Sequence, residues 1–488
     1  MGPSREVTVP PSPEQPAPAL DPVFPVDRTL LERLLAEAMS RGADFADLYF
    51  EHRAEAGLSM EEDLLREAVA GVVSGMGVRV LSGERTGYAY TEDLTPEAMA
   101  RAARTAALVA AGAGAEASVN VSEGPVKDLY PVERPVEGMP LRDRVDFLRR
   151  ASAAARARDP RVSRVMVTMR DEVKTVAVAT SDGGLFRDRQ PMLMFRVGVV
   201  AEEAGKGRTT AGDGGGGRVG LEYFARRTPE EIGGEAARRA VLALDAEAAP
   251  AGPMPVVLGP GYSGILLHEA VGHPLEADFN RKGLSRYSKQ MGQVVASPLC
   301  TVVDDGTVAS SRGSLNVDDE GNPTSPTVLI DRGVLVGYMQ DRLSARLTGA
   351  RATGNGRRQS YAHPPMPRMT NTYLPAGPHD PEEILRSVKR GVYAASFSGG
   401  QVDISKGDFV FSATEAYLIE DGAITKPLRG VTLVGNGPDV MGRVEMVGSD
   451  FRFSDGMWTC GKNGQSVPVG VGLPTVKISS ITVGGTGG

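Results

Sequence analysis

Two histidines and a glutamate lie close together in the segment LLHEAVGHPLEAD, residues 266–278. The chain has only five histidines, and His268 and His273 stand near each other, with Glu269 directly after the first. Burying two imidazoles and a carboxylate without partners is costly, so an otherwise apolar segment that carries them needs something to compensate them. Imidazole nitrogens bind zinc and a neighbouring carboxylate can act as a general base, so these residue types are typical of metal-dependent hydrolysis.

The spacing of the two histidines differs from that of the common zinc-protease helix. In H-E-x-x-H the histidines are roughly 40° apart on an α-helix, whereas the longer step from His268 to His273 separates them by roughly 140°. A π-bulge takes up one extra residue and restores the alignment, and Gly272 and Pro274 permit a distortion here. The spacing leaves two interpretations open, a metal site on a distorted helix or two buried histidines with structural partners.

A metal site needs a third ligand from elsewhere in the chain. The candidates are Glu276, Asp278, Cys300, His363, His379 and Cys460. Cys300 lies in the apolar segment VVASPLCTVVDD, where a buried and inert thiol is expected. Cys460 lies in MWTCGKNGQSVPVG, where Gly461 lets the backbone approach an ion closely, and zinc binds thiolate well. Spacing alone does not select a cysteine so far from His273.

Composition places the chain among globular proteins and excludes several functions. With 41% hydrophobic and 24% charged residues in 488, it is long enough for two to four compact units. A net charge of -7 argues against nucleic acid and anionic lipid as partners. We find neither a long apolar span nor a signal peptide, and the two cysteines fit a reducing compartment, so a cytoplasmic protein is expected.

The hydrophobic pattern predicts an α+β protein of two units behind an extension. Residues 1–26 carry eight prolines and are expected to be a flexible extension. Residues 27–250 form the N-terminal α+β domain, in which a helix, several strands and a helix that begins with TPE follow one another twice; we interpret this as a probable internal duplication. Residues 251–488 form a β-rich C-terminal domain, a sandwich or barrel-like structure that carries the metal-binding helix.

Longer segments resemble the TldD/PmbA family of metalloproteases, specifically its catalytic TldD-type subunit. The segments include HEAVGHPLEADFNRKG, TGNGRRQSYAHPPMPRMTNTY, GGQVDISKGDFVFS and TCGKNGQSVPVGVG, and the resemblance covers nearly everything from about residue 28. It implies one Zn²⁺ per chain, with His268, His273 and Cys460 as metal ligands and Glu269 as general base for a zinc-bound water. Pro274 and Ala277 depart from the glycines expected in the family's motif.

The resemblance also implies substrates and partners. It predicts cleavage of short or unfolded peptides by a homodimer or by a heterodimer with a PmbA-type subunit. The alternatives are a metal-containing subunit that binds peptides or supports assembly without catalysis, and an enzyme that hydrolyses a non-peptide amide. Further residues have candidate roles that compete with purely structural ones: Glu276 and Asp278 as acceptors for a ligand's outer N–H, Tyr361 and His363 as oxyanion donors, and Arg357 and Arg358 as contacts for a peptide carboxylate.

Overall fold

The computed structural model describes residues 23–111 and 119–485. Most of the expected extension therefore lies outside the described residues. Its end is a correction to that prediction, because Phe24 and Val26 are buried among the residues of the first helix and first strands. The packed part of the chain thus begins before residue 27. Among the described residues, no helix combines the length and apolar character needed to cross a membrane.

The N-terminal unit is built on one long twisted sheet with the strand order β3-β2-β1-β5-β6-β7 and the short β4 at the side of β6. Its elements are α1 Arg28–Met39, β1 Phe45–Glu61, β2 Leu64–Ser82, β3 Arg85–Thr91, α2 Pro96–Ala110, β4 Ser122–Glu123, α3 Leu141–Arg158, β5 Val162–Thr180, β6 Gly184–Glu203, β7 Gly207–Gly217, α4 Tyr223–Arg226 and α5 Pro229–Leu244. The order helix, three strands, helix occurs twice, as the sequence predicts. The two copies join where β1 pairs antiparallel with β5.

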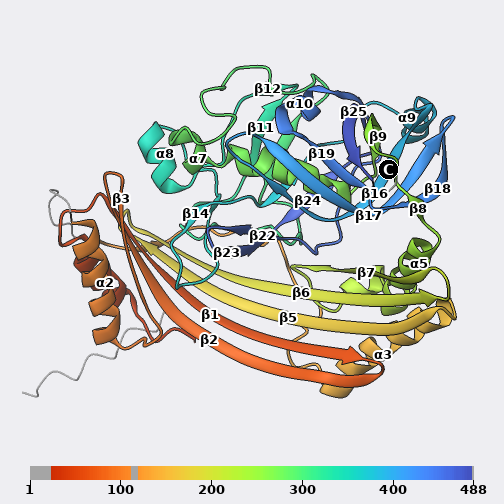
Figure 1. The fold of residues 1–488 in the computed structure, drawn as a ribbon. Coiled ribbons are helices and arrows are strands. Elements are labelled where there is room, and N and C mark those ends of the chain that lie inside the picture. Colours follow the sequence, from red (N-terminus) through yellow and green to blue (C-terminus); the bar gives the residue numbers. More distant parts are fainter. Residues whose placement is uncertain (1–22, 112–118, 486–488) are drawn as a thin grey trace, which may run out of the picture.

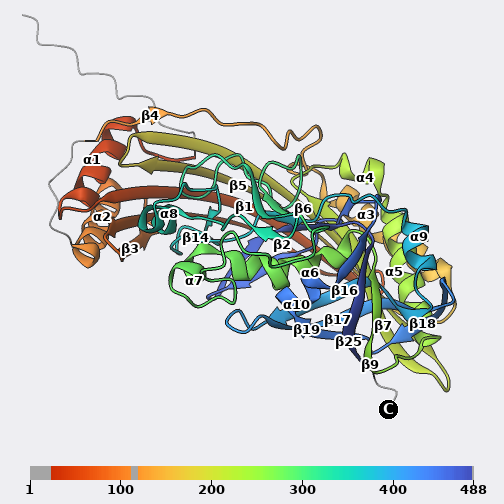
Figure 2. The ribbon, with the colours of Figure 1, turned by 90° about the horizontal axis from the view of Figure 1, so that it is seen from above.

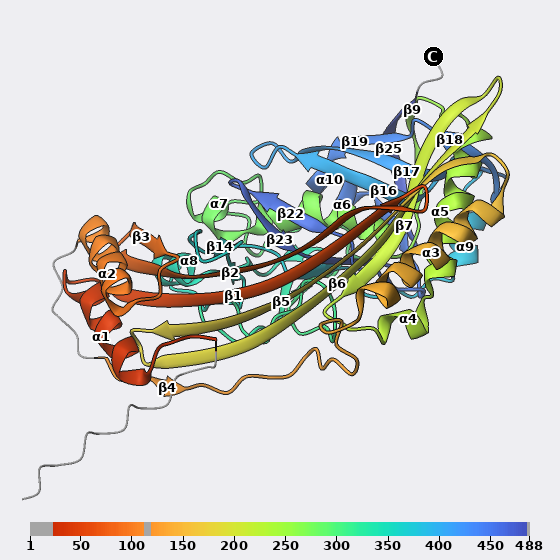
Figure 3. The same cartoon turned by 90° about the horizontal axis from the view of Figure 1, so that it is seen from below.

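Each copy packs its helices at a different end of the long sheet (Figure 3). Thr95 and Thr228 cap α2 and α5 through side-chain hydrogen bonds to the first helical turn, and a proline follows each cap. The apolar faces of α1 and α2 form one core with one end of the sheet, and those of α3 and α5 form a second core with the other end. The middle of the sheet is left without helices, and the C-terminal unit lies over it (Figures 1 and 2).

The C-terminal unit is rich in short strands, as predicted. Its helical elements are η1 Tyr262–Gly264, α6 Ile265–Leu267, η2 His268–Gly272, η3 His273–Leu275, α7 Ala277–Arg281, α8 Arg342–Thr348, α9 Pro381–Arg386 and α10 Gly437–Gly442. Its strands are β8 Glu247–Ala248, β9 Gly252–Leu258, β10 Val302–Asp305, β11 Pro326–Asp331, β12 Val334–Leu335, β13 Gly356–Arg357, β14 Met366–Pro367, β15 Asn371–Tyr373, β16 Arg390–Val402, β17 Asp408–Glu420, β18 Ala423–Arg429, β19 Thr432–Asn436, β20 Val444–Val447, β21 Arg452–Phe453, β22 Thr459–Lys462, β23 Gln465–Pro468, β24 Gly470–Leu473 and β25 Val476–Gly484.

Five of these strands close into a ring, in which β16, β9, β25, β19 and β17 pair in turn and β17 pairs again with β16. Of the two architectures expected for this domain, a sandwich or a barrel-like structure, the closed ring agrees with the barrel-like one. The Asp421-Gly422 turn between β17 and β18 has positive φ at both residues, as a tight hairpin requires. The helical segment with the histidines runs through the main core of this unit, whose members include Leu266, Ala270 and Val271.

Candidate metal centre

The histidine-bearing segment changes its helical winding at the histidines. The α-helical turn α6 runs directly into the π-helical segment η2, His268–Gly272, and a 3₁₀ turn follows from His273. A π turn holds more residues than an α turn, so it brings side chains five positions apart onto the same face. The imidazole rings of His268 and His273 are 5.0 Å apart, centroid to centroid, at an interplanar angle of 82°. The distortion that the metal-site interpretation requires is present.

The third candidate ligand comes from strand β22, far along the chain. The Sγ atom of Cys460 lies 3.3 Å from Nε2 of His273, and the ligand atoms of His268, His273 and Cys460 all lie within 4.8 Å of one another. In a tetrahedral zinc site the ligand atoms are roughly 3.5 Å apart, so these donors are grouped on the scale of one ion. Nδ1 of His268 is buried with no hydrogen-bond partner among the described residues. Two imidazoles and a thiolate fit a zinc ion in donor type.

A buried ion pair orients the second histidine. Nδ1 of His273 lies 3.1 Å from Oε2 of Glu276, which leaves Nε2 directed at Cys460. Nζ of Lys462 lies 3.0 Å from Oε2 of Glu276 and 2.7 Å from Oδ1 of Asp278. Burial opposes the charge on Glu276, but the cations of Lys462 and His273 lower its pKa to about 2. The carboxylate therefore stays charged and accepts a hydrogen bond from Nδ1 of His273, which fixes the direction of the ring.

The surroundings also prepare Cys460 to be a ligand. Burial disfavours the thiolate, yet the charge and hydrogen bonds of His268 and His273 hold the pKa of the Cys460 thiol well below its ordinary value. The guanidinium of Arg368 donates to the backbone oxygen of Cys460 at 2.6 Å and so fixes the strand that carries the sulfur. A cysteine in this setting is a thiolate, the form that binds a metal ion.

Glu269 faces a pocket that opens beside the three candidate ligands. The pocket has a volume of about 640 Å³, and its walls include Glu269, Trp458, Lys462 and residues 398–402 of β16. The side chain of Glu269 has no hydrogen bond or ion pair among the described residues, and burial raises its pKa although both histidines oppose the shift. A carboxylate with a raised pKa at the edge of a pocket is suited to accept and return a proton.

Other residues singled out from the sequence lie elsewhere. The Tyr361 hydroxyl donates to Glu92 at 3.1 Å and Nδ1 of His363 contacts the Ser360 hydroxyl, and neither residue lines the pocket beside Glu269. The oxyanion role considered for them is therefore wrong for this pocket. His379 binds the backbone of Val447. Cys300 is buried, and burial raises its pKa to about 12, which makes it an inert thiol.

Sequence reasoning missed two cations that support the site. Lys462 pairs with Glu276 and Asp278, and Arg368 holds the carbonyl of Cys460. Lys462 stands two residues after Cys460, so period-two alternation along a strand was a signal for placing both on one face. Arg368 offered no such signal, because its contact depends on tertiary packing.

Comparisons with known proteins give one family along most of the chain. Models of the PmbA/TldA metallopeptidase family match residues 46–110 (domain 1), 134–244 (central domain) and 251–485 (C-terminal domain). A metalloprotease TldD homolog of Haemophilus influenzae is 46% identical over 91% of this chain and 94% of its own. A zinc metalloprotease TldD homolog of Saccharolobus solfataricus is 35% identical over 51% of this chain and 55% of its own. The crystal structure of TldE from Thermococcus kodakarensis has a TM-score of 0.72 at 20% identity, covering 93% of this chain and 99% of that one.

Proposed function

The chain belongs to the PmbA/TldA metallopeptidase family, and from that premise we propose that it is a zinc-dependent peptidase acting on short or unfolded peptides. The observation that carries the proposal is the meeting of His268, His273 and Cys460 in one buried cluster with Glu269 in the adjoining pocket wall. The relative that is named a zinc metalloprotease supports the choice of metal. A nitrogen, nitrogen and sulfur donor set leaves a fourth position open, as catalytic zinc sites do.

Each residue of the site has a defined role in this proposal. A zinc ion held by the three donors supplies Lewis-acid chemistry, lowering the pKa of a water molecule and polarising the scissile carbonyl. Glu269 accepts the proton of the attacking water and returns it to the leaving amine. Glu276 keeps the ring of His273 in position, and Lys462 keeps Glu276 charged.

A strand edge beside the pocket supports an extended substrate. Residues 398–402 line the pocket, and within the described residues this part of β16 pairs on one side only, with β17. A peptide that pairs with the open edge makes backbone hydrogen bonds regardless of its side chains. We expect broad sequence tolerance and selection for segments without stable structure.

The long hairpin β1–β2 supports assembly with another chain. Its far part exposes several apolar side chains, with exposed fractions of 57% at Leu64, 41% at Leu65, 52% at Val69 and 64% at Val72. Apolar surface gathered in this way is typical of protein interfaces. We propose that a second copy or a PmbA-type subunit covers it, in a cytoplasmic complex; the likeness to TldE is one of fold.

The test compares the wild-type chain with Glu269→Ala and Cys460→Ser. An unstructured peptide is incubated with each protein, and products and bound zinc are measured. We expect about one zinc per chain and cleavage by the wild type, zinc without cleavage for Glu269→Ala, and a large loss of zinc for Cys460→Ser. His363→Ala is the matched histidine control, because His363 lies outside the pocket.

Each failure has a separate meaning. Equal product from the wild type and Glu269→Ala removes Glu269 as the base. Unchanged zinc in Cys460→Ser moves the third ligand elsewhere. Zinc without cleavage in the wild type, tested with either partner chain, leaves the non-catalytic peptide-binding subunit as the function.

A further inference from the structure

A second cavity lies between the long sheet and the hairpin β22–β23. Its volume is about 290 Å³, and its walls include Lys174 of β5, Met192 of β6 and Ser466 of β23. Thr459, the residue before Cys460, lines both this cavity and the pocket beside Glu269. The hairpin that carries the proposed sulfur ligand is therefore a wall common to the two spaces.

Three arginines in the wall of this second cavity have no carboxylate partner. Among the described residues, no carboxylate oxygen lies within 4 Å of the guanidinium nitrogens of Arg218, Arg312 or Arg357, in contrast to the many ion pairs elsewhere in the chain. Arg218 is 3% exposed and Arg357 2% exposed, and Nε of each is buried without a hydrogen-bond partner. Buried charges are normally paired, so this group departs from the rule.

The contacts of two of these arginines direct them to the β22–β23 hairpin. Arg312 donates to the backbone oxygen of Trp458 at 2.9 Å and to the Thr459 hydroxyl at 3.3 Å. Arg357 donates to the backbone oxygen of Pro468 at 2.8 Å, and Pro468 pairs with Thr459. Neutral carbonyl and hydroxyl groups hold the guanidinium groups in place without neutralising their charge.

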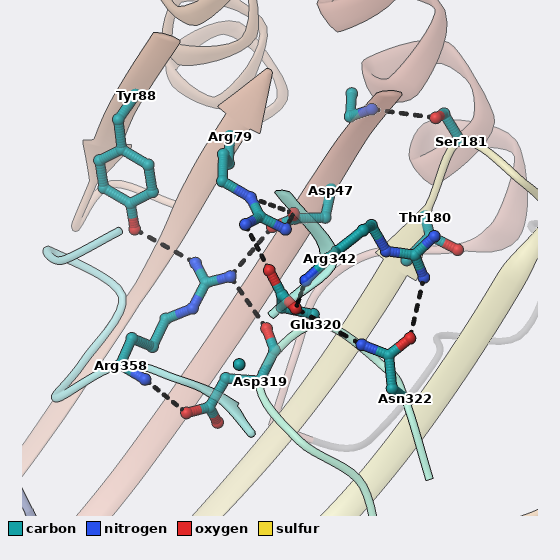
Figure 4. A network of polar contacts seen from close by, with 12 residues as sticks. Asp47, Arg79, Tyr88, Thr180, Ser181, Asp319, Glu320, Asn322, Arg342 and Arg358 are labelled. Atoms are coloured by element: carbon teal, nitrogen blue, oxygen red, sulfur yellow. Dashed lines mark hydrogen bonds and ion pairs between the residues drawn. The ribbon is translucent and has the colours of Figure 1, made fainter. Parts of the chain in front are cut away.

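Most of the other charged groups around the cavity are already engaged, and Lys174 adds one more positive charge to its wall. Arg358 binds Oδ1 of Asp47 at 3.0 Å, and its backbone N–H donates to Asp319 at 2.8 Å (Figure 4). Oε2 of Glu172 lies 3.7 Å from Nη1 of Arg53. The two acidic groups in the wall thus have cationic or N–H partners of their own, and neither pairs directly with any of the three arginines.

The energetic consequence is visible in the titration of two of these groups. Burial lowers the pKa of Arg312 to about 10, with Arg218 contributing in the same direction. Burial likewise lowers the pKa of Arg357 to about 10, although Asp319 opposes the shift. An anion that enters the cavity relieves this cost by pairing with the guanidinium groups.

We propose that Arg218, Arg312 and Arg357 form a subsite for a carboxylate of the peptide substrate. The inference rests on the proposed peptidase function, because the shared wall at Thr459 places the subsite next to the proposed zinc ligand. Guanidinium forks match the planar, singly charged carboxylate in geometry. Asp319 and Glu172 in the same wall disfavour a phosphate dianion. The peptide's C-terminus and an acidic side chain both supply this group.

The test measures peptide binding without turnover, using full-length Glu269→Gln protein with zinc present. A fluorescent unstructured peptide is compared as the free acid and as the C-terminal amide, and a third version replaces an internal Gln by Glu. We expect at least one carboxylate version to bind on the order of tenfold more tightly than the neutral amide. Arg312→Gln abolishes that difference in affinity between the carboxylate and amide versions. Arg312→Lys, which keeps the charge but not the fork, restores only part of it.

Control variants separate the subsite from general charge and from folding. Arg208→Gln removes an exposed arginine far from the cavity, 55% exposed at its side chain, and is expected to leave all three affinities unchanged. Arg218→Gln is expected to abolish the preference for a carboxylate as well. Arg218 lies over the ring of Tyr130 and not against the hairpin that holds Cys460, so this variant tests the subsite without disturbing that hairpin. Zinc content of every variant shows whether the metal centre is intact.

Two outcomes overturn the inference. The first is equal affinity of the Glu269→Gln protein, with Arg312 unchanged, for the free-acid, amide and Glu versions of the peptide. The second is competition by inorganic phosphate alone, with no preference among the peptides, which identifies a site for a free anion. If the peptides bind with the expected preference but the wild type does not cleave them, the subsite stands and the peptidase function fails. Cleavage without any carboxylate preference removes the subsite and leaves the peptidase function standing.

Discussion

Replacing Glu276 by glutamine tests whether the buried ion pair next to His273 controls metal affinity. The substitution keeps the size of the side chain and removes its charge. In the wild type, Oε2 of Glu276 lies 3.1 Å from Nδ1 of His273 and 3.0 Å from Nζ of Lys462. An amide can present either oxygen or NH₂ to the ring, so the substitution weakens both the basicity of His273 and the definition of its tautomer.

The magnitude follows from the role of such acceptors in known metal sites. Loss of the acceptor behind a ligating histidine lowers metal affinity roughly 10- to 100-fold, which is roughly 1.4 to 2.8 kcal/mol. Lys462 retains Asp278 at 2.7 Å and the backbone oxygen of Pro367 at 3.0 Å, so Glu276→Gln does not leave the ammonium group without partners. We therefore expect a folded protein with weakened zinc binding, measured by competition with a chromophoric chelator at neutral pH.

Asp278→Asn is the matched control for this prediction. It removes the same charge from the same lysine, but within the described residues Asp278 has no hydrogen bond or ion pair with either histidine. We expect its zinc affinity to stay within about threefold of the wild type, in keeping with the small coupling of indirect contacts. Equal zinc affinity of Glu276→Gln and the wild type refutes the reasoning. An equal loss in both variants shows that the charge near Lys462 matters and the contact with His273 does not.

Two further predictions concern stability. An alanine Cβ at Gly264, just before α6, would lie 2.7 Å from the backbone nitrogen of Gly472, so we expect Gly264→Ala to lower the unfolding free energy by about 1–3 kcal/mol in chemical denaturation. Gly234 in α5 has open space around it, so we expect Gly234→Ala to raise the unfolding free energy by about 0.5–1 kcal/mol. Burial raises the pKa of Asp213 to about 6 despite Arg227 and Arg239, so the folded chain binds more protons than the unfolded chain between 3.8 and about 6. The unfolding free energy of the wild type relative to Asp213→Asn should therefore fall by roughly 3 kcal/mol as pH rises through that window, and a flat or rising difference contradicts this reasoning.

Local patterns predict the helices and long strands of the N-terminal unit well, because each carries its own signal. Thr95 and Thr228 mark the start of α2 and α5 through caps that need no tertiary contact. Strand β7 carries no such signal, since its sequence ends in four glycines. Those glycines are required by packing: a Cβ at Gly215 would lie 1.8 Å from the Tyr223 hydroxyl, and at Gly216 it would lie 2.0 Å from the backbone oxygen of Leu193. Only the folded neighbours explain why a strand forms there.

The proposed metal centre likewise depends on both local and distant parts of the chain. The winding of the helix could be inferred from local spacing only on the metal-site interpretation, which needs a π turn to bring two histidines five positions apart onto one face. The arginine-lined cavity has no counterpart in sequence spacing, since its members come from separate segments of both units. Arg357 and Arg358 are neighbours in the chain, yet one lacks a carboxylate partner and the other is paired with Asp47. The difference between them comes from the sheet packed against them.

The position of Cys460, the proposed third donor, could not be inferred from its local sequence, but strand β22 determines it in the folded chain. Side chains alternate along a strand, and Cys460 and Lys462 are both buried toward the histidine-bearing segment, whereas Thr459 and Gly461 are on the opposite, exposed side. A slip of one residue in the pairing with β23 would replace the sulfur by a glycine and the ammonium by an asparagine at the same time. The register of one short hairpin therefore positions both the proposed sulfur donor and the cation that keeps Glu276 charged.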